Sequence, residues 1–246
     1  MAEKTRDGGI WETVKTVLYA IIIAMVVRTF AYEPFNIPSG SMIPTLLIGD
    51  YLFVSKFSYG YSRYSFPLGA GLYRGRIWAA PPKRGDVAVF KLPRDNETDY
   101  IKRIVGLPGD RLQVRAGVLH INGKPVERVR IEDYVYDDRA GNRSRVQQYR
   151  ETLPNGVTYR VLDSDPSGGL DNTGVYEVPP EHYFAMGDNR DNSSDSRVLN
   201  MVGYIPFDNL VGRAEILFFS TDGSARLWEP WQWPFATRFG RFGTLL

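Results

Sequence analysis

The sequence predicts a mostly β fold: an antiparallel β domain with a smaller inserted subdomain, preceded by one N-terminal transmembrane helix. From residue 51 onward, short runs of β-branched and aromatic residues are bounded by Gly, Pro, Asp or Asn, the pattern of strands and turns. Asn122-Gly123, between VLHI and KPV, indicates a two-residue hairpin, because both central residues must adopt positive φ. No apolar repeat of 3.6 residues follows Tyr32, which argues against a helical bundle.

Composition narrows the classes of function. The 246 residues suffice for one large domain or two modest ones. Lys plus Arg (30) nearly balances Asp plus Glu (28), which argues against a dedicated nucleic-acid-binding protein. Cysteine is absent, so disulfides, thiol nucleophiles and cysteine zinc sites are excluded. Two histidines are too few for a histidine-rich metal centre.

The N-terminal apolar run predicts a transmembrane anchor over 11–32. A helix of this length spans about 33 Å, enough for the roughly 30 Å hydrocarbon core of a bilayer. Three basic residues precede the apolar core, whereas none lies between Arg28 and Lys56. The positive-inside rule therefore places residues 1–10 in the cytoplasm and the rest of the chain outside it. A signal peptide cleaved after Ala31 and a buried core helix are the alternatives.

The rest of the chain divides by composition. Residues 33–126 and 175–225 contain the strand-like runs and are expected to form the β core. Residues 127–174 are rich in Arg, Asp, Asn and Gly, and are expected to form an exposed inserted subdomain. The tail, 226–246, contains three Trp and three Phe beside basic residues, which is typical of a segment at a bilayer interface. Packing of the same rings on the β core is an equal alternative.

The residue types present limit which side chains can act as a nucleophile and as its base. A serine nucleophile needs a base, and His120 and His182 are both interpreted as structural residues. A lysine can serve as base where burial lowers its pKa from about 10.4. In DYIKRIVG, strand alternation puts Tyr100, Lys102 and Ile104 on one face, where Lys102 would be desolvated. An edge-strand lysine that reaches solvent remains the alternative.

Two polar segments complete the candidate site. In the segment Ser39-Gly40-Ser41-Met42, glycine lets the backbone approach a substrate closely, and flanking prolines stiffen the loop. GDNRDNSSDSR (187–197) alternates Asp and Asn in a way that suggests a calcium loop. It lacks the central Gly and closing Glu of an EF-hand, so no metal is expected. We interpret it as a hydrogen-bonding loop that holds another residue in place.

These motifs, in this order and after an N-terminal anchor, closely resemble bacterial type I signal peptidase (leader peptidase), a family of Ser/Lys dyad peptidases. The resemblance rests on PSGSMIPTLLIGDYLFVSKFSYG, KRGDVAVFK, YIKRIVGLPGD and GDNRDNSSDSR, and it covers 32–123 and 179–214. It implies that Ser41 is the nucleophile and Lys102 its general base. It also implies an oxyanion hole formed by the Ser39 side chain and the backbone N–H of Ser41.

The resemblance further implies supporting residues and a substrate cleft. Support is expected from one serine and two ion pairs: Ser193, which would hydrogen-bond the amine of Lys102, then Asp195 with Arg197, and Asp188 with Arg103. The residues expected at the substrate cleft are Phe35, Ile37, Pro38, Met42 and Ile101.

The function implied is that of a membrane-anchored serine endopeptidase that removes signal peptides, with small residues at −1 and −3, from exported precursors. It would need no cofactor and bind no nucleic acid, and it would act on the outer face of the bacterial cytoplasmic membrane. Its partners would be precursors, the lipid bilayer and, as a candidate, the export translocon. Alternatives are a mitochondrial-type or conjugative-transfer peptidase, a self-cleaving repressor-type peptidase, and a non-enzymatic anchored β scaffold or binding domain. Neither the insertion nor the tail matches a family motif convincingly.

Overall fold

The computed structural model describes residues 9–66, 75–137, 143–165, 168–225 and 228–246, and it is mostly β as predicted. Its helices and strands are α1 (Gly9–Phe30), β1 (Tyr32–Asn36), β2 (Asp50–Ser55), β3 (Val87–Lys91), β4 (Asp99–Gly106), β5 (Arg111–Arg115), β6 (Val118–Ile121), β7 (Lys124–Pro125), β8 (Glu127–Arg130), β9 (Tyr134–Asp137), β10 (Arg143–Val146), β11 (Gln148–Thr152), β12 (Thr158–Leu162), β13 (Tyr176–Glu177), β14 (His182–Met186), β15 (Ile205–Pro206), β16 (Leu210–Ser220) and α2 (Trp233–Ala236).

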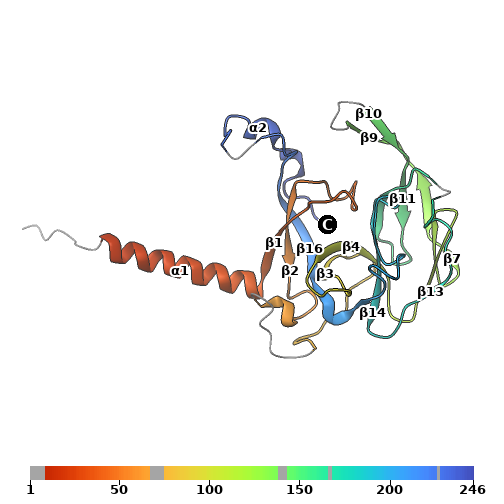
Figure 1. Ribbon diagram of the computed structural model, residues 1–246, viewed down its shortest axis with the longest axis horizontal. Helices are drawn as coiled ribbons and strands as arrows, with labels where there is room; N and C mark the ends of the chain where they lie inside the picture. The colour runs from red at the N-terminus through yellow and green to blue at the C-terminus, as the bar shows by residue number, and fades with distance from the viewer. Residues whose placement is uncertain (1–8, 67–74, 138–142, 166–167, 226–227) are drawn as a thin grey trace, which may run out of the picture.

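A seven-stranded antiparallel sheet forms the main body, in the order β1-β2-β16-β3-β4-β14-β15. Strand β16 shifts register against both β2 and β3, and such bulges increase local twist, in keeping with the curled sheet in Figure 1. Strand β4 lies between β3 and β14, and Lys102 pairs with Ala88 of β3. Lys102 is therefore on an interior strand, and the edge-strand alternative is wrong.

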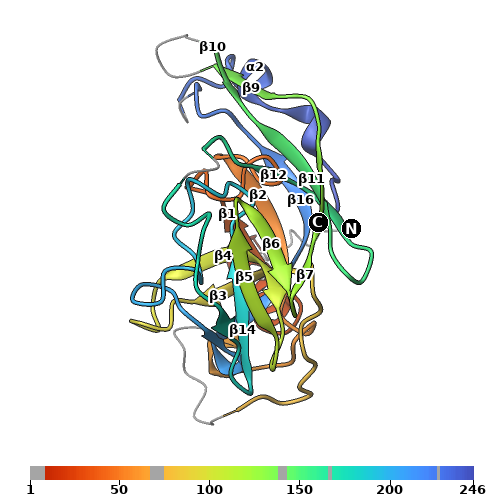
Figure 2. The ribbon, with the colours of Figure 1, turned by 90° about the vertical axis from the view of Figure 1, so that its right-hand side faces the viewer.

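The strands between β4 and β14 form a second layer beside the main sheet (Figures 1 and 2). A four-stranded sheet has the order β13-β5-β6-β7, a three-stranded sheet has the order β12-β11-β8, and β9 pairs with β10. The predicted hairpin is confirmed, because Asn122 and Gly123 both have positive φ (53° and 79°) between β6 and β7.

The predicted insertion, 127–174, begins where the three-stranded sheet begins and ends just before β13. Its apolar side chains share one core with the four-stranded sheet: Leu153 and Val161 pack with Val114 and Leu119, and all four are fully buried. This segment is therefore less exposed than its polar composition suggests, since its strands cover a face of the neighbouring sheet.

Helix α1 projects from the β body (Figure 1). It is long and apolar enough to cross a bilayer, and none of its apolar window is buried against the described residues, so the core-helix alternative is wrong. The helix ends two residues earlier than predicted, because Tyr32 already pairs with Ser55 at the start of β1. Arg28, in its last turn, forms an ion pair with Glu33 that ties the helix to β1. Of the predicted cytoplasmic segment, residues 1–8 lie outside the described residues.

The C-terminal tail is tied to the sheet through its backbone and two arginines, of which Arg238 donates to the Ile48 carbonyl (3.0 Å) and to Ser220 Oγ (3.4 Å). Leu245 bridges to Ile216, and Arg241 forms an ion pair with the fully buried Asp50. The six aromatic side chains of the tail are exposed: Trp228, Trp231, Trp233, Phe235, Phe239 and Phe242. Phe242 nevertheless contacts Phe219 of β16, and Phe239 contacts Phe242, so the alternative that the rings pack on the β core applies to this part of the tail. Helix α2 lies on the side of the body from which α1 projects (Figure 1).

Candidate active site

The loop between β1 and β2 carries Ser41 and is held from the opposite side by the polar loop after β14. The backbone N–H of Asn189 donates to the Ser41 carbonyl (3.1 Å), and its side-chain amide donates to the Gly40 carbonyl (3.0 Å). The two loops approach so closely that a Cβ at Gly187 would lie 2.6 Å from the Ser41 carbonyl oxygen. A glycine at 187 is therefore needed for the contact that fixes the serine loop.

Lys102 reaches Ser41 from strand β4. Its Nζ lies 2.7 Å from Ser41 Oγ and 2.9 Å from the carbonyl oxygen of Ile101, and the residue is only 3% exposed. Burial lowers the pKa of Lys102 from 10.5 to about 8, although the charges of Asp195 and Asp188 act in the opposite direction. At pH 7 about a tenth of the amine is therefore uncharged, and this uncharged form is placed to accept the Ser41 proton.

Ser39 lies two residues before Ser41 at the mouth of the same loop. Its hydroxyl is 3.4 Å from Ser41 Oγ, and its side chain is exposed to the cleft. This position suits a donor that meets an oxyanion as Ser41 attacks a carbonyl group. The oxyanion role of Ser39 and of the Ser41 N–H stays a prediction.

Two buried ion pairs flank the candidate dyad, and they join the partners expected from the sequence. Asp188 accepts two hydrogen bonds from Arg103, at 2.9 and 2.7 Å. Asp195 accepts two from Arg197, both at 2.9 Å, and one from the backbone N–H of Gly187. Burial alone would raise the pKa of Asp195, but the charge and hydrogen bonds of Arg197 outweigh it and hold the pKa below its ordinary value.

Ser193 does not make the hydrogen bond to Lys102 that the resemblance implied. Its hydroxyl is buried and lies close enough to Asp195 to help lower the pKa of that carboxylate, but it makes no hydrogen bond to Lys102. The amine of Lys102 instead bonds Ser41 and the Ile101 carbonyl. The Ser193 side chain packs against Gly187, where any Cβ would meet its Oγ at 2.2 Å. In this structure the Ser193 side chain packs beside the dyad, and its role in orienting the amine stays a prediction.

An open cleft of about 520 Å³ runs past the dyad. Four of the five residues expected there do line it: Phe35, Ile37, Pro38 and Ile101. Met42 does not, which corrects the prediction, because its side chain is fully buried in the core beside Leu46. The lining also contains residues that the sequence did not assign to it: Asn36, Gly40, Val89, Asp99, Tyr100, Asn192 and Ser194. Val89 could have been inferred only from its pairing with Ile101 across β3 and β4.

The insertion also contacts this site, through residues that the sequence did not identify. Arg190 and Glu151 form a fully buried ion pair, and the hydroxyl of Tyr159 donates to Glu151 at 2.8 Å. The guanidinium of Arg103 lies 4.3 Å from the centre of the Tyr159 ring. Charged residues of the polar loop and of β4 are thus packed against β11 and β12. The histidines take no part in the lining: His120 bonds the Val118 carbonyl and His182 that of Pro180, as expected for structural residues.

A serine hydroxyl hydrogen-bonded to a buried lysine, beside an open cleft with apolar walls, fits nucleophilic attack on a carbonyl group. That is the chemistry of serine hydrolases that use an amine as base.

Comparison with known proteins identifies the class more closely. The family model for signal peptidase, peptidase S26, matches residues 10–219. Signal peptidase I from Rickettsia typhi is 44% identical over 211 residues, covering 82% of this chain and 78% of that protein, and its counterpart from Rickettsia prowazekii is 43% identical over the same lengths. The crystal structure of a signal peptidase I from Enterococcus faecalis is 25% identical with a TM-score of 0.32, covering 55% of this chain and 97% of the other. The chain belongs to the signal peptidase, peptidase S26 family and is a serine endopeptidase.

Proposed function

We propose that this protein is a membrane-anchored endopeptidase that removes N-terminal signal peptides from exported precursor proteins, with Ser41 as nucleophile and Lys102 as general base. The observation that carries the proposal is the 2.7 Å contact between the buried Lys102 amine and the Ser41 hydroxyl beside the cleft. The family relationship supports the same conclusion, because its curated relatives are named signal peptidase I.

The reaction follows from the positions of these groups. Uncharged Lys102 accepts the Ser41 proton while Ser41 Oγ attacks the scissile carbonyl, and the oxyanion meets the Ser41 N–H and the Ser39 hydroxyl. The ammonium group then protonates the leaving amine of the mature protein, and the signal peptide remains as an acyl-enzyme. Lys102, uncharged again, removes a proton from water, and the water oxygen attacks the carbonyl carbon of the acyl-enzyme. This step releases the signal peptide and restores the Ser41 hydroxyl. The hydrogen bond to the Ile101 carbonyl keeps the amine in place during both steps.

The substrate preference follows from the walls of the cleft. Phe35, Ile37, Val89 and Ile101 contribute apolar groups to its lining beside the dyad, and we propose that this surface binds small side chains of an extended peptide. A larger side chain would clash, which favours precursors with small residues at −1 and −3. A pocket of this kind discriminates by about 1–3 kcal/mol for each methylene group.

The anchor and the tail support action at a membrane surface. We propose that α1 spans the bacterial cytoplasmic membrane with its N-terminus inside, leaving the β core (33–126 and 175–225) and the insertion (127–174) on the outer face. The exposed rings of the tail (226–246) would rest in the bilayer interface, since α2 lies on the side from which α1 projects (Figure 1). The bilayer and the export translocon are the partners that this arrangement brings near the enzyme.

The test uses the purified full chain in lipid vesicles with a precursor protein and with the same protein lacking its signal peptide. Cleavage by the wild type should yield one new N-terminus after a small residue, identified by N-terminal sequencing. Ser41→Ala should abolish cleavage, and Lys102→Met should lower kcat by about 10²–10⁴-fold, because the base is lost. Lys124→Met, at an exposed lysine on β7, is the matched control and should cleave normally. Full activity in either dyad variant would refute the assigned roles.

A further inference from the structure

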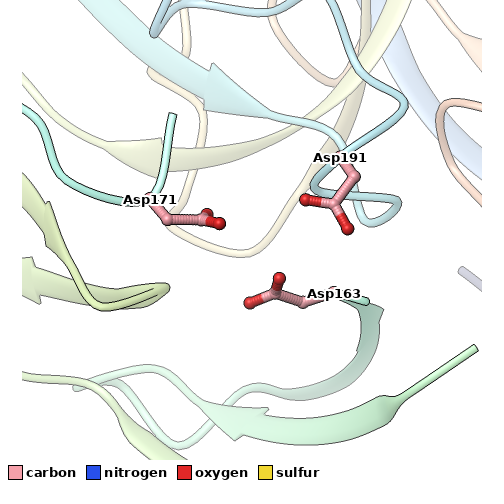
Figure 3. A group of neighbouring side chains, drawn as sticks. All are labelled: Asp163, Asp171 and Asp191. Atoms are coloured by element: carbon pink, nitrogen blue, oxygen red, sulfur yellow. The ribbon is translucent and has the colours of Figure 1, made fainter. Parts of the chain in front are cut away.

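Three aspartates that are distant in the sequence converge behind the polar loop (Figure 3). Asp163 follows β12, Asp171 lies in the loop before β13, and Asp191 lies in the loop after β14. One carboxylate oxygen from each lies within 4.8 Å of the other two. Figure 3 shows the three carboxylates turned toward one shared space. The first two residues are buried, with 1% and 2% of their surface exposed.

The charges around this cluster, which we call the aspartate cluster, do not balance. Arg128 forms an ion pair with one oxygen of Asp163, and one oxygen of Asp191 accepts hydrogen bonds from the backbone N–H and hydroxyl of Ser164. Two buried oxygens remain without a hydrogen-bond partner among the described residues: Asp163 Oδ1 and Asp171 Oδ2. Among the described residues, Arg128 is the one ion-pair partner of these three carboxylates, and Asp171 and Asp191 have none. Buried anionic oxygens are normally paired or bound to a metal.

The two buried oxygens without a hydrogen-bond partner among the described residues, Asp163 Oδ1 and Asp171 Oδ2, need either a proton or a cation. A single proton can bridge only one pair of oxygens, whereas three carboxylates converge here. A cation satisfies both orphaned oxygens and the third carboxylate together.

We propose that Asp163, Asp171 and Asp191 bind one hard divalent cation, and that this cation is calcium. An all-oxygen donor set selects a hard cation over zinc or copper. Calcium–oxygen distances of about 2.3–2.6 Å allow ligand oxygens up to about 5 Å apart across the ion, which accommodates the observed spacing. Magnesium, at about 2.0–2.1 Å, allows only about 4 Å and demands stricter octahedral geometry. Water and backbone carbonyls would complete the coordination shell.

The site joins the insertion to the loop that holds the nucleophile. Leu162, next to Asp163, donates its N–H to the Asp188 carbonyl, and the N–H of Arg190 donates to the Leu162 carbonyl. Asn189, which holds the serine loop, lies between these two contacts. A cation bound beside them would stabilise this junction, so its role is structural and is independent of the peptidase assignment.

The experiment measures calcium binding to the full chain in detergent after removal of metals with EGTA and dialysis. Titration calorimetry with CaCl₂ should give one site per chain, and calcium at about 100 times its Kd should raise the Tm by several degrees. Asp171→Asn, at a residue without an ion pair in the described structure, should fold without metal and lose both responses. Asp222→Asn, at an exposed carboxylate outside the cluster, should keep both.

Several outcomes would overturn the proposal. A wild-type chain that binds no calcium at millimolar concentration, or an Asp171→Asn chain that binds it as tightly as the wild type, would exclude the site. A response to MgCl₂ without one to CaCl₂ would refute the assignment to calcium. Calcium binding and Tm are measured without substrate. A chain that binds no calcium therefore leaves the proposed peptidase function unaffected, and a chain that cleaves no precursor leaves the proposed calcium site unaffected.

Discussion

Lys102→Met should lower kcat by about 10²–10⁴-fold while making the folded protein more stable at neutral pH. Methionine fills nearly the same volume and carries no charge. Because the pKa of Lys102 falls from 10.5 to about 8 by burial, the fold opposes its ammonium form by about 3 kcal/mol at pH 7. The variant removes that cost and loses hydrogen bonds to Ser41 and to the Ile101 carbonyl, worth about 1 kcal/mol together or slightly more. The net gain in free energy of unfolding at pH 7 should therefore be about 1–2 kcal/mol.

The pH dependence of the free energy of unfolding distinguishes the removal of a disfavoured charge from a change in side-chain packing. Between pH 8 and pH 10.5 the unfolded lysine binds more protons than the folded one, so the stability of the wild type rises with pH across that window. The methionine variant has no such group. Its advantage over the wild type should shrink by about 3 kcal/mol between pH 7 and pH 10.5, and its sign should reverse.

Urea unfolding of both proteins in detergent, at pH 7 and at pH 10.5, measures this difference directly. Lys124→Met controls for the general loss of a lysine and should change the free energy of unfolding equally at both pH values, because its side chain is exposed. If the difference in free energy of unfolding between Lys102→Met and the wild type did not change with pH, burial would not lower the pKa of Lys102. Normal cleavage by this variant would show that it is not the base.

Three further changes test the surroundings of the dyad. Asp188→Asn leaves the buried charge of Arg103 unpaired, so the free energy of unfolding should fall by about 3–5 kcal/mol in urea titrations; an unchanged value would mean that the pair does not form. Asn189→Asp removes the donor that holds the Gly40 carbonyl, so kcat for precursor cleavage should fall about tenfold, whereas an unaffected kcat would show that the serine loop positions itself. Ile101→Ala widens the cleft and should raise kcat/KM for a valine-bearing substrate relative to an alanine-bearing one by about tenfold, and an unaltered ratio would place the specificity wall elsewhere.

The sequence predicted those features of the fold that depend on local signals. The hairpin at Asn122-Gly123 follows from two residues that accept positive φ, and α1 follows from one apolar run. The neighbours of each strand were beyond prediction, because β2 pairs with β16 across more than half of the chain. For the same reason alternation alone could not say whether Lys102 lies inside the sheet. Adjacent positions of β4 are both buried, and Arg103 tolerates burial only because Asp188 comes from a distant loop.

The same dependence on long-range contacts explains which residues of the site were missed. The resemblance identified Ser41 and Lys102, but the roles of Asn189 and of the aspartate cluster depend on contacts between loops far apart in the sequence. Asp188 and Asp195 lie close enough to Lys102 to favour its charged form. Each of these carboxylates is bound by its own arginine, so burial outweighs their charge and the pKa stays low. The two ion pairs thus place carboxylates beside the amine of Lys102 without making it permanently cationic, and the effect of either residue of a pair cannot be predicted from the sequence without knowing its partner.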